Sequence, residues 1–156
     1  MNSKFLETLK QGVLTDSPES TAECARRLGE IIPENQVIGL SGDLGAGKTT
    51  FVRGLAQAWG VEQPVTSPTF NLFVSYSGRI RNLVHLDAYR LDRANALDDL
   101  MVEDFLSPPW AFVIEWPENL KGEDRDWLLD AIHLSLQIEP GSQLHKITLL
   151  KGPATA

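Results

Sequence analysis

The chain is poor in cysteine, in basic residues and in long apolar runs. Cys24 is the only cysteine among 156 residues, so an internal disulfide and a cysteine cluster for zinc are both excluded. Fourteen Lys and Arg residues face 21 Asp and Glu residues, which gives a net charge of −7. Because neutralisation of phosphates supplies most nucleic-acid affinity, we expect any contact with a nucleic acid to depend on a partner protein.

No apolar stretch approaches the length of about 18 residues that indicates a membrane span. The first residues, MNSKFLETLKQGVL, also lack the apolar run of a secretory signal. No repeat, low-complexity tract or long linker divides the chain, and 42% of its residues are hydrophobic, enough for a substantial core. We therefore expect a single soluble domain over residues 1–156, cytoplasmic and without a role at membranes.

Helical periodicity and short apolar runs alternate along the chain. They predict helices over 15–35, 48–59 and 94–106, and strands over 36–42, 111–116, both halves of 69–87, and both arms of a hairpin within 131–150. Asp16 or Ser17 is expected to cap the first helix. This order of elements predicts an α/β domain with a mainly parallel, mixed central sheet flanked by helices.

A phosphate-binding motif follows the first predicted strand. Residues 42–49 match G-x-x-x-x-G-K-[ST] at every fixed position, which predicts the P-loop NTPase fold. Glycines let backbone N–H groups crowd around an anion, and the following helix N-terminus favours phosphate. Lys48 is expected to reach the β and γ phosphates, and the Thr49 hydroxyl to bind Mg²⁺. The predicted phosphate contacts are Asp43, Leu44, Gly45, Ala46, Gly47, Lys48, Thr49 and Thr50.

The base of the nucleotide is predicted from a motif that is missing. A guanine-binding protein usually carries Asn-Lys-x-Asp, and the nearest segment here is ENLKGED at 118–124. Leu120 separates Asn119 from Lys121 in this segment, so the motif fails. Adenine is the better prediction, and ATP with Mg²⁺ the expected cofactor pair.

Two acidic residues end predicted strands at the edge where the phosphate loop lies. Asp87 ends the apolar run of NLVHLD, and Glu115 ends that of AFVIE. In open α/β sheets the ligand lies off the carboxyl ends of the strands, so both acids should project toward it. We expect Glu115 to hold Mg²⁺, directly or through water, and Asp87 to orient or deprotonate the attacking water. The alternatives are a turn cap for Asp87 and a solvated acid for Glu115.

Other residues near these acids have simpler interpretations. His85 faces the same side of its strand as Asp87 and is expected to be a packed histidine. Trp116 either packs at the rim of the core or responds to the state of the nucleotide. Four acidic residues are expected on the solvent-exposed face of a helix: Asp98, Asp99, Glu103 and Asp104. Four arginines are expected to form a basic surface patch able to contact a partner or RNA: Arg79, Arg81, Arg90 and Arg93.

Four segments together resemble the bacterial TsaE (YjeE) family, small ATPases of tRNA threonylcarbamoyladenosine biosynthesis. They are GDLGAGKTTFVRGL (42–55), SPTF (67–70), HLDAYRLD (85–92) and IEWPENL (114–120). The resemblance implies slow hydrolysis of ATP-Mg²⁺ by the chain alone and work with two partners, a TsaD-like transferase subunit and its TsaB-like paralogue. It implies that ATP turnover supports this complex, which modifies the adenosine beside the anticodon.

The resemblance also implies roles for individual positions. Thr49 matches a P-loop ligand of Mg²⁺, Asp87 a switch-like acid implicated in hydrolysis, and Glu115 a second acid associated with Mg²⁺. Trp116 matches the tryptophan beside that acid, and residues 67–70 match a loop near the nucleotide and the partner surface. Ser17 and Gln143 are the positions proposed beside the adenine.

Three other functions remain compatible with the P-loop. One is an ATP-gated binding module in which docking to partners matters more than hydrolysis. The second is a small-molecule kinase, in which the region Arg79–Arg93 would imitate a cationic lid. The third is a switch GTPase, which the missing guanine motif disfavours.

Overall fold

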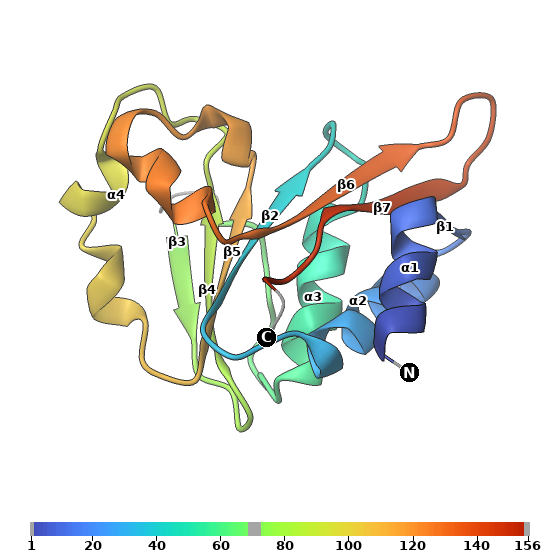
Figure 1. Ribbon diagram of the computed structural model, residues 1–156, viewed down its shortest axis with the longest axis horizontal. Coiled ribbons are helices and arrows are strands. Elements are labelled where there is room, and N and C mark those ends of the chain that lie inside the picture. The colour runs from blue at the N-terminus through green and yellow to red at the C-terminus, as the bar shows by residue number, and fades with distance from the viewer. Residues whose placement is uncertain (1, 69–72, 155–156) are drawn as a thin grey trace.

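The computed structural model describes residues 2–68 and 73–154 and contains one mixed seven-stranded sheet (Figure 1). The strand order is β1-β7-β6-β2-β5-β4-β3. Strands β6, β2, β5 and β4 are parallel to one another, whereas β7, β1 and β3 join antiparallel. The strands are β1 (Val13–Thr15), β2 (Gln36–Ser41), β3 (Phe73–Tyr76), β4 (Asn82–Asp87), β5 (Trp110–Glu115), β6 (Ile132–Ile138) and β7 (His145–Lys151). The α/β class and the parallel centre of the sheet are confirmed.

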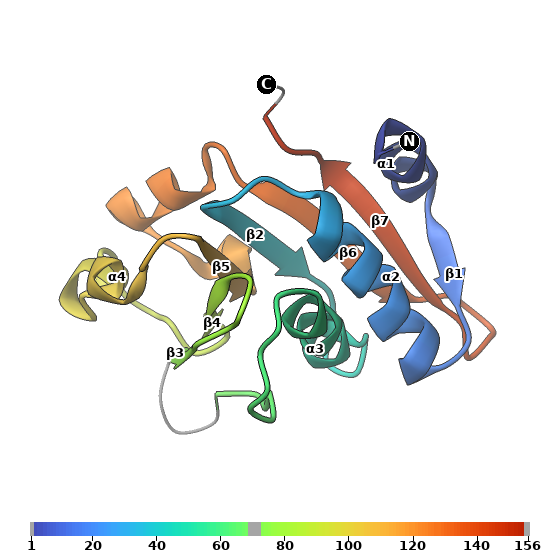
Figure 2. The same ribbon diagram turned by 90° about the horizontal axis from the view of Figure 1, so that it is seen from below.

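Two helices from the predicted set cover one face of the sheet (Figure 2). They are α2 (Pro18–Ile31) and α3 (Lys48–Ala58). Ser17 begins α2 as its N-cap, in a capping box in which its side chain and that of Ser20 each accept from the other's backbone N–H. That use of the Ser17 side chain favours capping over a contact with adenine.

The two faces of the sheet carry separate apolar clusters. Alternation along β2 sends Ile38 and Leu40 into the cluster beneath α2 and α3, and Val37 into the opposite one. The opposite cluster is covered by α4 (Ala96–Asp99) and the 3₁₀ helices η1 (Val102–Phe105) and η3 (Gly122–Leu128), which lie together in Figure 1. Apolar packing on both faces of the sheet thus fixes the positions of the carboxyl ends of the parallel strands.

The predicted helix over 94–106 is wrong as a single element. The chain forms α4, then η1, with Met101 between them in the left-handed conformation (φ 55°). A left-handed residue cannot continue a right-handed helix, so the backbone turns there. The turn brings both Leu97 and Val102 into the core, although their five-residue separation does not suit one face of a helix.

The N-terminal segment contributes two elements that the sequence patterns did not indicate. Helix α1 (Asn2–Gln11) buries Leu9, and β1 pairs with β7 at the edge of the sheet. The terminal hairpin of β6 and β7 is confirmed, as is the pairing of β3 with β4 around Ser77-Gly78. Within the part of the chain described, no helix is long and apolar enough to cross a membrane.

Candidate active site

The phosphate loop links the end of β2 to the start of α3. Gly42 and Gly47 take positive φ angles of 155° and 104°. A Cβ atom on Gly42 would lie 2.2 Å from the carbonyl oxygen of Leu136 in β6, so only glycine fits against this strand. Thr49 and Thr50 lie in the first turn of α3, where free backbone N–H groups face an incoming anion.

Lys48 lies folded back over the loop. Its Nζ donates to the carbonyl oxygens of Gly42 and Asp43, the latter at 3.0 Å, and lies 4.5 Å from the ring centroid of Trp116. Burial lowers the pKa of Lys48, and the nearby carboxylates of Glu115 and Asp87 oppose that shift. A partly buried ammonium group is stabilised by negatively charged oxygens more than by neutral backbone carbonyls, so phosphate oxygens are suitable partners for Lys48.

The two predicted acids lie side by side at the carboxyl ends of parallel strands. Asp87 of β4 is in register with Glu115 of β5, and Glu115 is in register with Leu40 at the end of β2. The P-loop begins two residues after Leu40. The structure thus brings Asp87 and Glu115 to the loop that carries Lys48 and Thr49, as predicted from the strand ends.

Glu115 is not a solvated acid, because only 4% of it is exposed. Its Oε2 lies 2.5 Å from Nε2 of His85, a fully buried residue of β4. The other ring nitrogen of His85, Nδ1, is buried without a hydrogen-bond partner among the residues described. His85 is a packed histidine, as expected, and its contact also fixes the orientation of the Glu115 carboxylate.

Asp87 is half-buried and caps the turn that follows its strand. Its Oδ1 accepts a hydrogen bond of 3.0 Å from the backbone N–H of Tyr89. This contact is the turn cap that the sequence left as an alternative to a catalytic role. A capped carboxylate retains further lone pairs, so the cap holds the group in place without using its capacity to accept from water.

A hard divalent cation suits the donor set near Lys48. The carboxylates of Glu115 and Asp87 and the hydroxyl of Thr49 are oxygen ligands of the kind that Mg²⁺ prefers. In residues 2–68 and 73–154, no three His, Cys, Asp or Glu side chains are arranged to hold a metal by themselves. This arrangement fits Mg²⁺, which commonly takes one or two carboxylates and completes its shell with phosphate oxygens and water.

Trp116 forms the rim of the site. It adopts the left-handed conformation (φ 59°), and its ring packs on Tyr89 with the ring centroids 5.0 Å apart. The rim-packing interpretation therefore holds, and a response to the nucleotide stays a prediction. Ser67 and Pro68 of the predicted partner loop lie within the described chain, whereas Thr69 and Phe70 lie outside the described residues.

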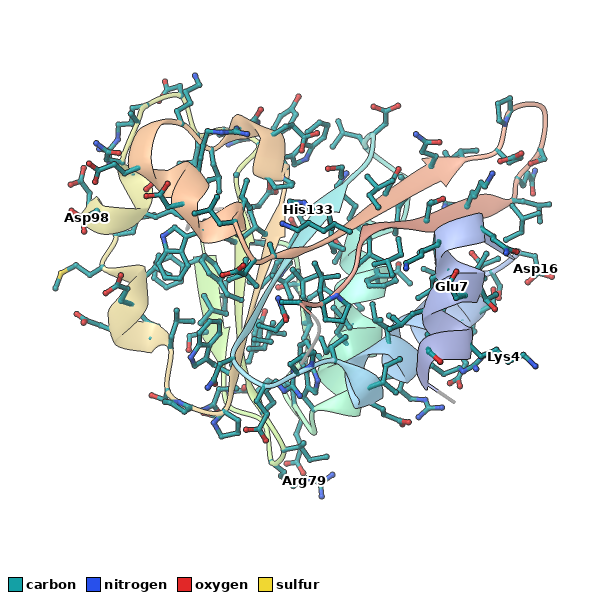
Figure 3. All side chains as sticks on the ribbon, viewed as in Figure 1. Lys4, Glu7, Asp16, Arg79, Asp98 and His133 are labelled. Carbon is teal, nitrogen blue, oxygen red and sulfur yellow. The ribbon has the colours of Figure 1, made fainter. Side chains whose placement is uncertain are left out.

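The basic patch is not formed as predicted. Arg81 is buried, with its guanidinium donating to the carbonyls of Pro33 and Ile32, and Arg93 forms an ion pair with Asp99. Arg79 projects from the loop between β3 and β4, away from Asp98 on α4 (Figure 3). The expectation of a surface position is wrong for Arg81, because the loop before β4 folds this residue into the interior. The four acids from Asp98 to Asp104 are exposed, as expected.

Two residues at the site were missed by the sequence analysis. His145 at the start of β7 places Nδ1 2.7 Å from the carbonyl oxygen of Ala46 in the P-loop. Asn119, in the 3₁₀ helix η2 (Pro117–Asn119), donates from Nδ2 to the backbone carbonyls of Ala88 and Tyr89. Neither contact has a local sequence signal, because the partners lie 99 positions away for His145 and about thirty for Asn119.

Comparison with known proteins supports the family suggested by the four segments. Residues 15–146 match the family described as threonylcarbamoyl adenosine biosynthesis protein TsaE. Two relatives are named tRNA threonylcarbamoyladenosine biosynthesis protein TsaE. The Treponema pallidum protein is 38% identical over 69% of this chain and 78% of its own length. The Nostoc protein is 42% identical over 65% of each chain, just under two thirds.

A solved structure has the same architecture. The crystal structure of YdiB from Bacillus subtilis superposes with a TM-score of 0.69 at 27% identity, covering 88% of this chain and 82% of the other. The chain belongs to the TsaE family of threonylcarbamoyladenosine biosynthesis proteins and has its P-loop NTPase fold.

Proposed function

We propose that the chain binds ATP with Mg²⁺ and hydrolyses it. The observation that carries the proposal is the register of β4 and β5, which sets Asp87 beside Glu115 at the edge of the sheet where the P-loop presents Lys48. Phosphoryl transfer needs little covalent help from a protein, so catalysis depends on positioning and on stabilisation of charge. A lysine, a buried acid and a half-buried acid around a phosphate loop suit that task.

Each residue then has a defined task. Backbone N–H groups of residues 43–50 surround the phosphates, and Lys48 leaves the carbonyls of Gly42 and Asp43 for the β and γ phosphates. Thr49 and Glu115 would hold Mg²⁺, and the bound metal would supply neutralisation of charge on the phosphate oxygens. Asp87 accepts a hydrogen bond from the attacking water and orients it toward the γ phosphate.

ATP is proposed over GTP for two reasons. The Asn-Lys-x-Asp motif is missing. The residue that most resembles its asparagine, Asn119, uses its side-chain amide to hold the backbone of Ala88 and Tyr89. An amide committed to this contact is not available to read a guanine.

The biological role is proposed from the names of the relatives. Both are proteins of tRNA threonylcarbamoyladenosine biosynthesis. We propose that ATP turnover by this chain supports a complex of a TsaD-like transferase and a TsaB-like paralogue in the cytoplasm. Because the chain has a net charge of −7, we propose that it approaches tRNA only through these partners.

A small-molecule kinase is the weaker alternative. A kinase usually closes a cationic lid over the phosphates to exclude water. The arginines that would imitate a lid are placed elsewhere: Arg81 is buried beneath Pro33, and Arg79 lies at the opposite end of β4 from Asp87. Arg79 and Arg81 therefore give no support for a lid, whereas Arg90 is exposed three residues after Asp87.

Phosphate release from ATP tests the proposed chemistry. With purified protein and Mg²⁺, we expect slow release, lowered about 100-fold or more by Glu115→Ala, because a buried metal ligand is lost. Glu34→Ala is the control, since Glu34 is exposed at the opposite end of β2. Normal Mg²⁺-dependent turnover in Glu115→Ala would overturn the metal assignment. Stoichiometric phosphorylation of a metabolite without partners would favour a kinase.

The role in tRNA modification is tested separately. Threonylcarbamoyladenosine is measured in tRNA over several turnovers, with the transferase pair present and this chain either added or omitted. We expect omission to stop formation after the first turnovers, and Lys48→Ala to behave like omission. Equal yields with and without the chain would refute a supporting role, whatever the ATPase assay shows.

A further inference from the structure

The loops after β4 and β5 are tied together by contacts that the proposed chemistry does not yet use. Backbone hydrogen bonding continues past the strands, with the N–H of Ala88 donating to the carbonyl of Glu115 at 2.9 Å. On the other side, Nδ2 of Asn119 donates to the carbonyls of Ala88 at 3.1 Å and Tyr89 at 3.2 Å. One amide group with two hydrogens therefore holds two successive peptide carbonyls.

Asn119 is itself anchored. Its backbone N–H donates to the carbonyl of Trp116 at 3.0 Å, and the next residue, Leu120, is 2% exposed in the apolar cluster beneath α4. The short 3₁₀ turn of η2 joins this anchor to Glu115 and Trp116. Because the backbone of Asn119 is fixed, its side chain can hold the loop after β4 in a defined position.

The loop that Asn119 holds is the one that holds Asp87. The N–H of Tyr89 donates to Oδ1 of Asp87 at 3.0 Å, so the carboxylate and the peptide of Tyr89 form one turn. Asn119 binds the carbonyl side of the same residue. The position of the Asp87 carboxylate thus depends on a contact made from the strand end that carries Glu115.

We propose that Asn119 is a positioning residue that clamps the turn 87–89 to the 115–119 loop and so fixes the distance between the Asp87 carboxylate and the Glu115 carboxylate. The inference rests on the proposed function, in which these two acids orient water and hold Mg²⁺. Orientation matters because a displacement of about 1 Å at a reacting group can cost about 100-fold in rate. Asn119 need not touch the nucleotide to act in this way.

Hydrogen exchange tests the clamp without any activity. In Asn119→Ala we expect the amides of Tyr89 and Leu91 to exchange about fivefold faster or more, because both hydrogen bonds from Nδ2 to this turn are lost. Asn35→Gly is the matched control: Asn35 bonds the N–H of Trp110 at the other end of β5, and glycine keeps its positive φ. The control should leave both amides unchanged. Unchanged exchange in Asn119→Ala would overturn the clamp even if the chain hydrolysed no ATP.

Kinetics test the link to Asp87. We expect Asn119→Ala to lower kcat about tenfold with KM for ATP within about twofold, because positioning for the chemical step is lost and phosphate binding is kept. Asn35→Gly should change neither parameter. In the double variant with Asp87→Asn, the Asn119→Ala change should slow hydrolysis by less than about twofold, because the group that it positions is already gone.

These results separate the clamp from the proposed function. Wild-type protein without Mg²⁺-dependent hydrolysis would refute the function, whereas wild-type hydrolysis with full kcat in Asn119→Ala would refute the positioning role. Asn119→Asp serves as a second variant of the same size. It faces two carbonyl oxygens with an acceptor, so exchange at Tyr89 should be faster still than in Asn119→Ala. Additive losses with Asp87→Asn would show that Asn119 acts by another route.

Discussion

At the scale of single residues, the contact between His85 and Glu115 is buried and has no local sequence signal. The two side chains meet at 2.5 Å in a site from which water is nearly excluded. Residues that orient a metal ligand commonly change metal affinity by about 10- to 100-fold when they are replaced. We therefore expect His85→Ala to raise the Mg²⁺ concentration needed for half-maximal ATPase activity about tenfold or more, measured by Mg²⁺ titration at saturating ATP.

The matched control for His85 is His133, a half-buried histidine of β6 outside the site. His133→Ala should leave the Mg²⁺ midpoint unchanged. Urea unfolding of both variants reports the cost to stability, which we expect at about 1–3 kcal/mol for His85→Ala because Glu115 is left buried without its partner. A loss of stability with no shift of the Mg²⁺ midpoint would make His85 a purely structural residue.

Single residues also show what sequence alone can and cannot predict. The sequence predicts that Asp87 and Glu115 lie side by side, because a charge at the end of an apolar strand is a local signal and parallel strands end at one edge of a sheet. The contacts of His85 and Asn119 were not found, because each partner lies about thirty positions away and only the register of β4 and β5 brings them together. Register follows from the packing of the whole sheet.

At the scale of elements, the β2–loop–α3 unit depends on one glycine. A Cβ on Gly42 would lie 2.2 Å from the carbonyl oxygen of Leu136, and the φ angle of 155° is itself unfavourable for other residues. We expect Gly42→Ala to push the loop away from β6, to cost about 1–3 kcal/mol of stability and to weaken ATP binding strongly. Urea unfolding and a nucleotide-binding titration measure the two effects.

Gly141→Ala is the control for Gly42→Ala, because it introduces backbone strain without a steric clash of the added Cβ atom. Gly141 also has a positive φ, of 74°, but a Cβ there meets nothing within 4 Å, in a turn between β6 and β7. Gly141→Ala should cost about 1–2 kcal/mol from strain alone and leave ATP affinity unchanged. If the Gly42→Ala protein bound ATP as tightly as wild type, the close approach of loop and strand would not matter for the site.

Elements differ in how well patterns predicted them. Helices α2 and α3 and the central strands have clear apolar patterns in the sequence. The prediction of these elements as helices and strands is therefore confirmed. Strand β1 has three residues and is a strand only because β7 pairs with it, so no local pattern marks it. The 94–106 region read as helical because helix-forming residues dominate it. Burial of Leu97 and Val102 then overrode that preference.

At the scale of the whole molecule, charge decides how the chain can reach a nucleic acid. The excess of acidic residues is not offset by a basic face at the predicted place, since Arg81 is internal and Arg93 is paired with Asp99. A described surface that lacks a basic patch at this place releases few counterions there when it meets RNA and gains little affinity from that source. We therefore expect access to tRNA to come from a partner, as proposed above.

We therefore expect the chain alone to bind tRNA more weakly than the roughly 10⁻⁴–10⁻⁶ M typical of non-specific binders at physiological salt. Fluorescence anisotropy with labelled tRNA at about 150 mM salt measures this affinity, with and without ATP-Mg²⁺. Adding the transferase pair should bring the chain into a complex with tRNA, detected as co-migration on a sizing column. Micromolar binding by the chain alone, weakening steeply as salt rises, would mean that the described surface holds a basic site that its net charge conceals, and tRNA would then be a direct partner.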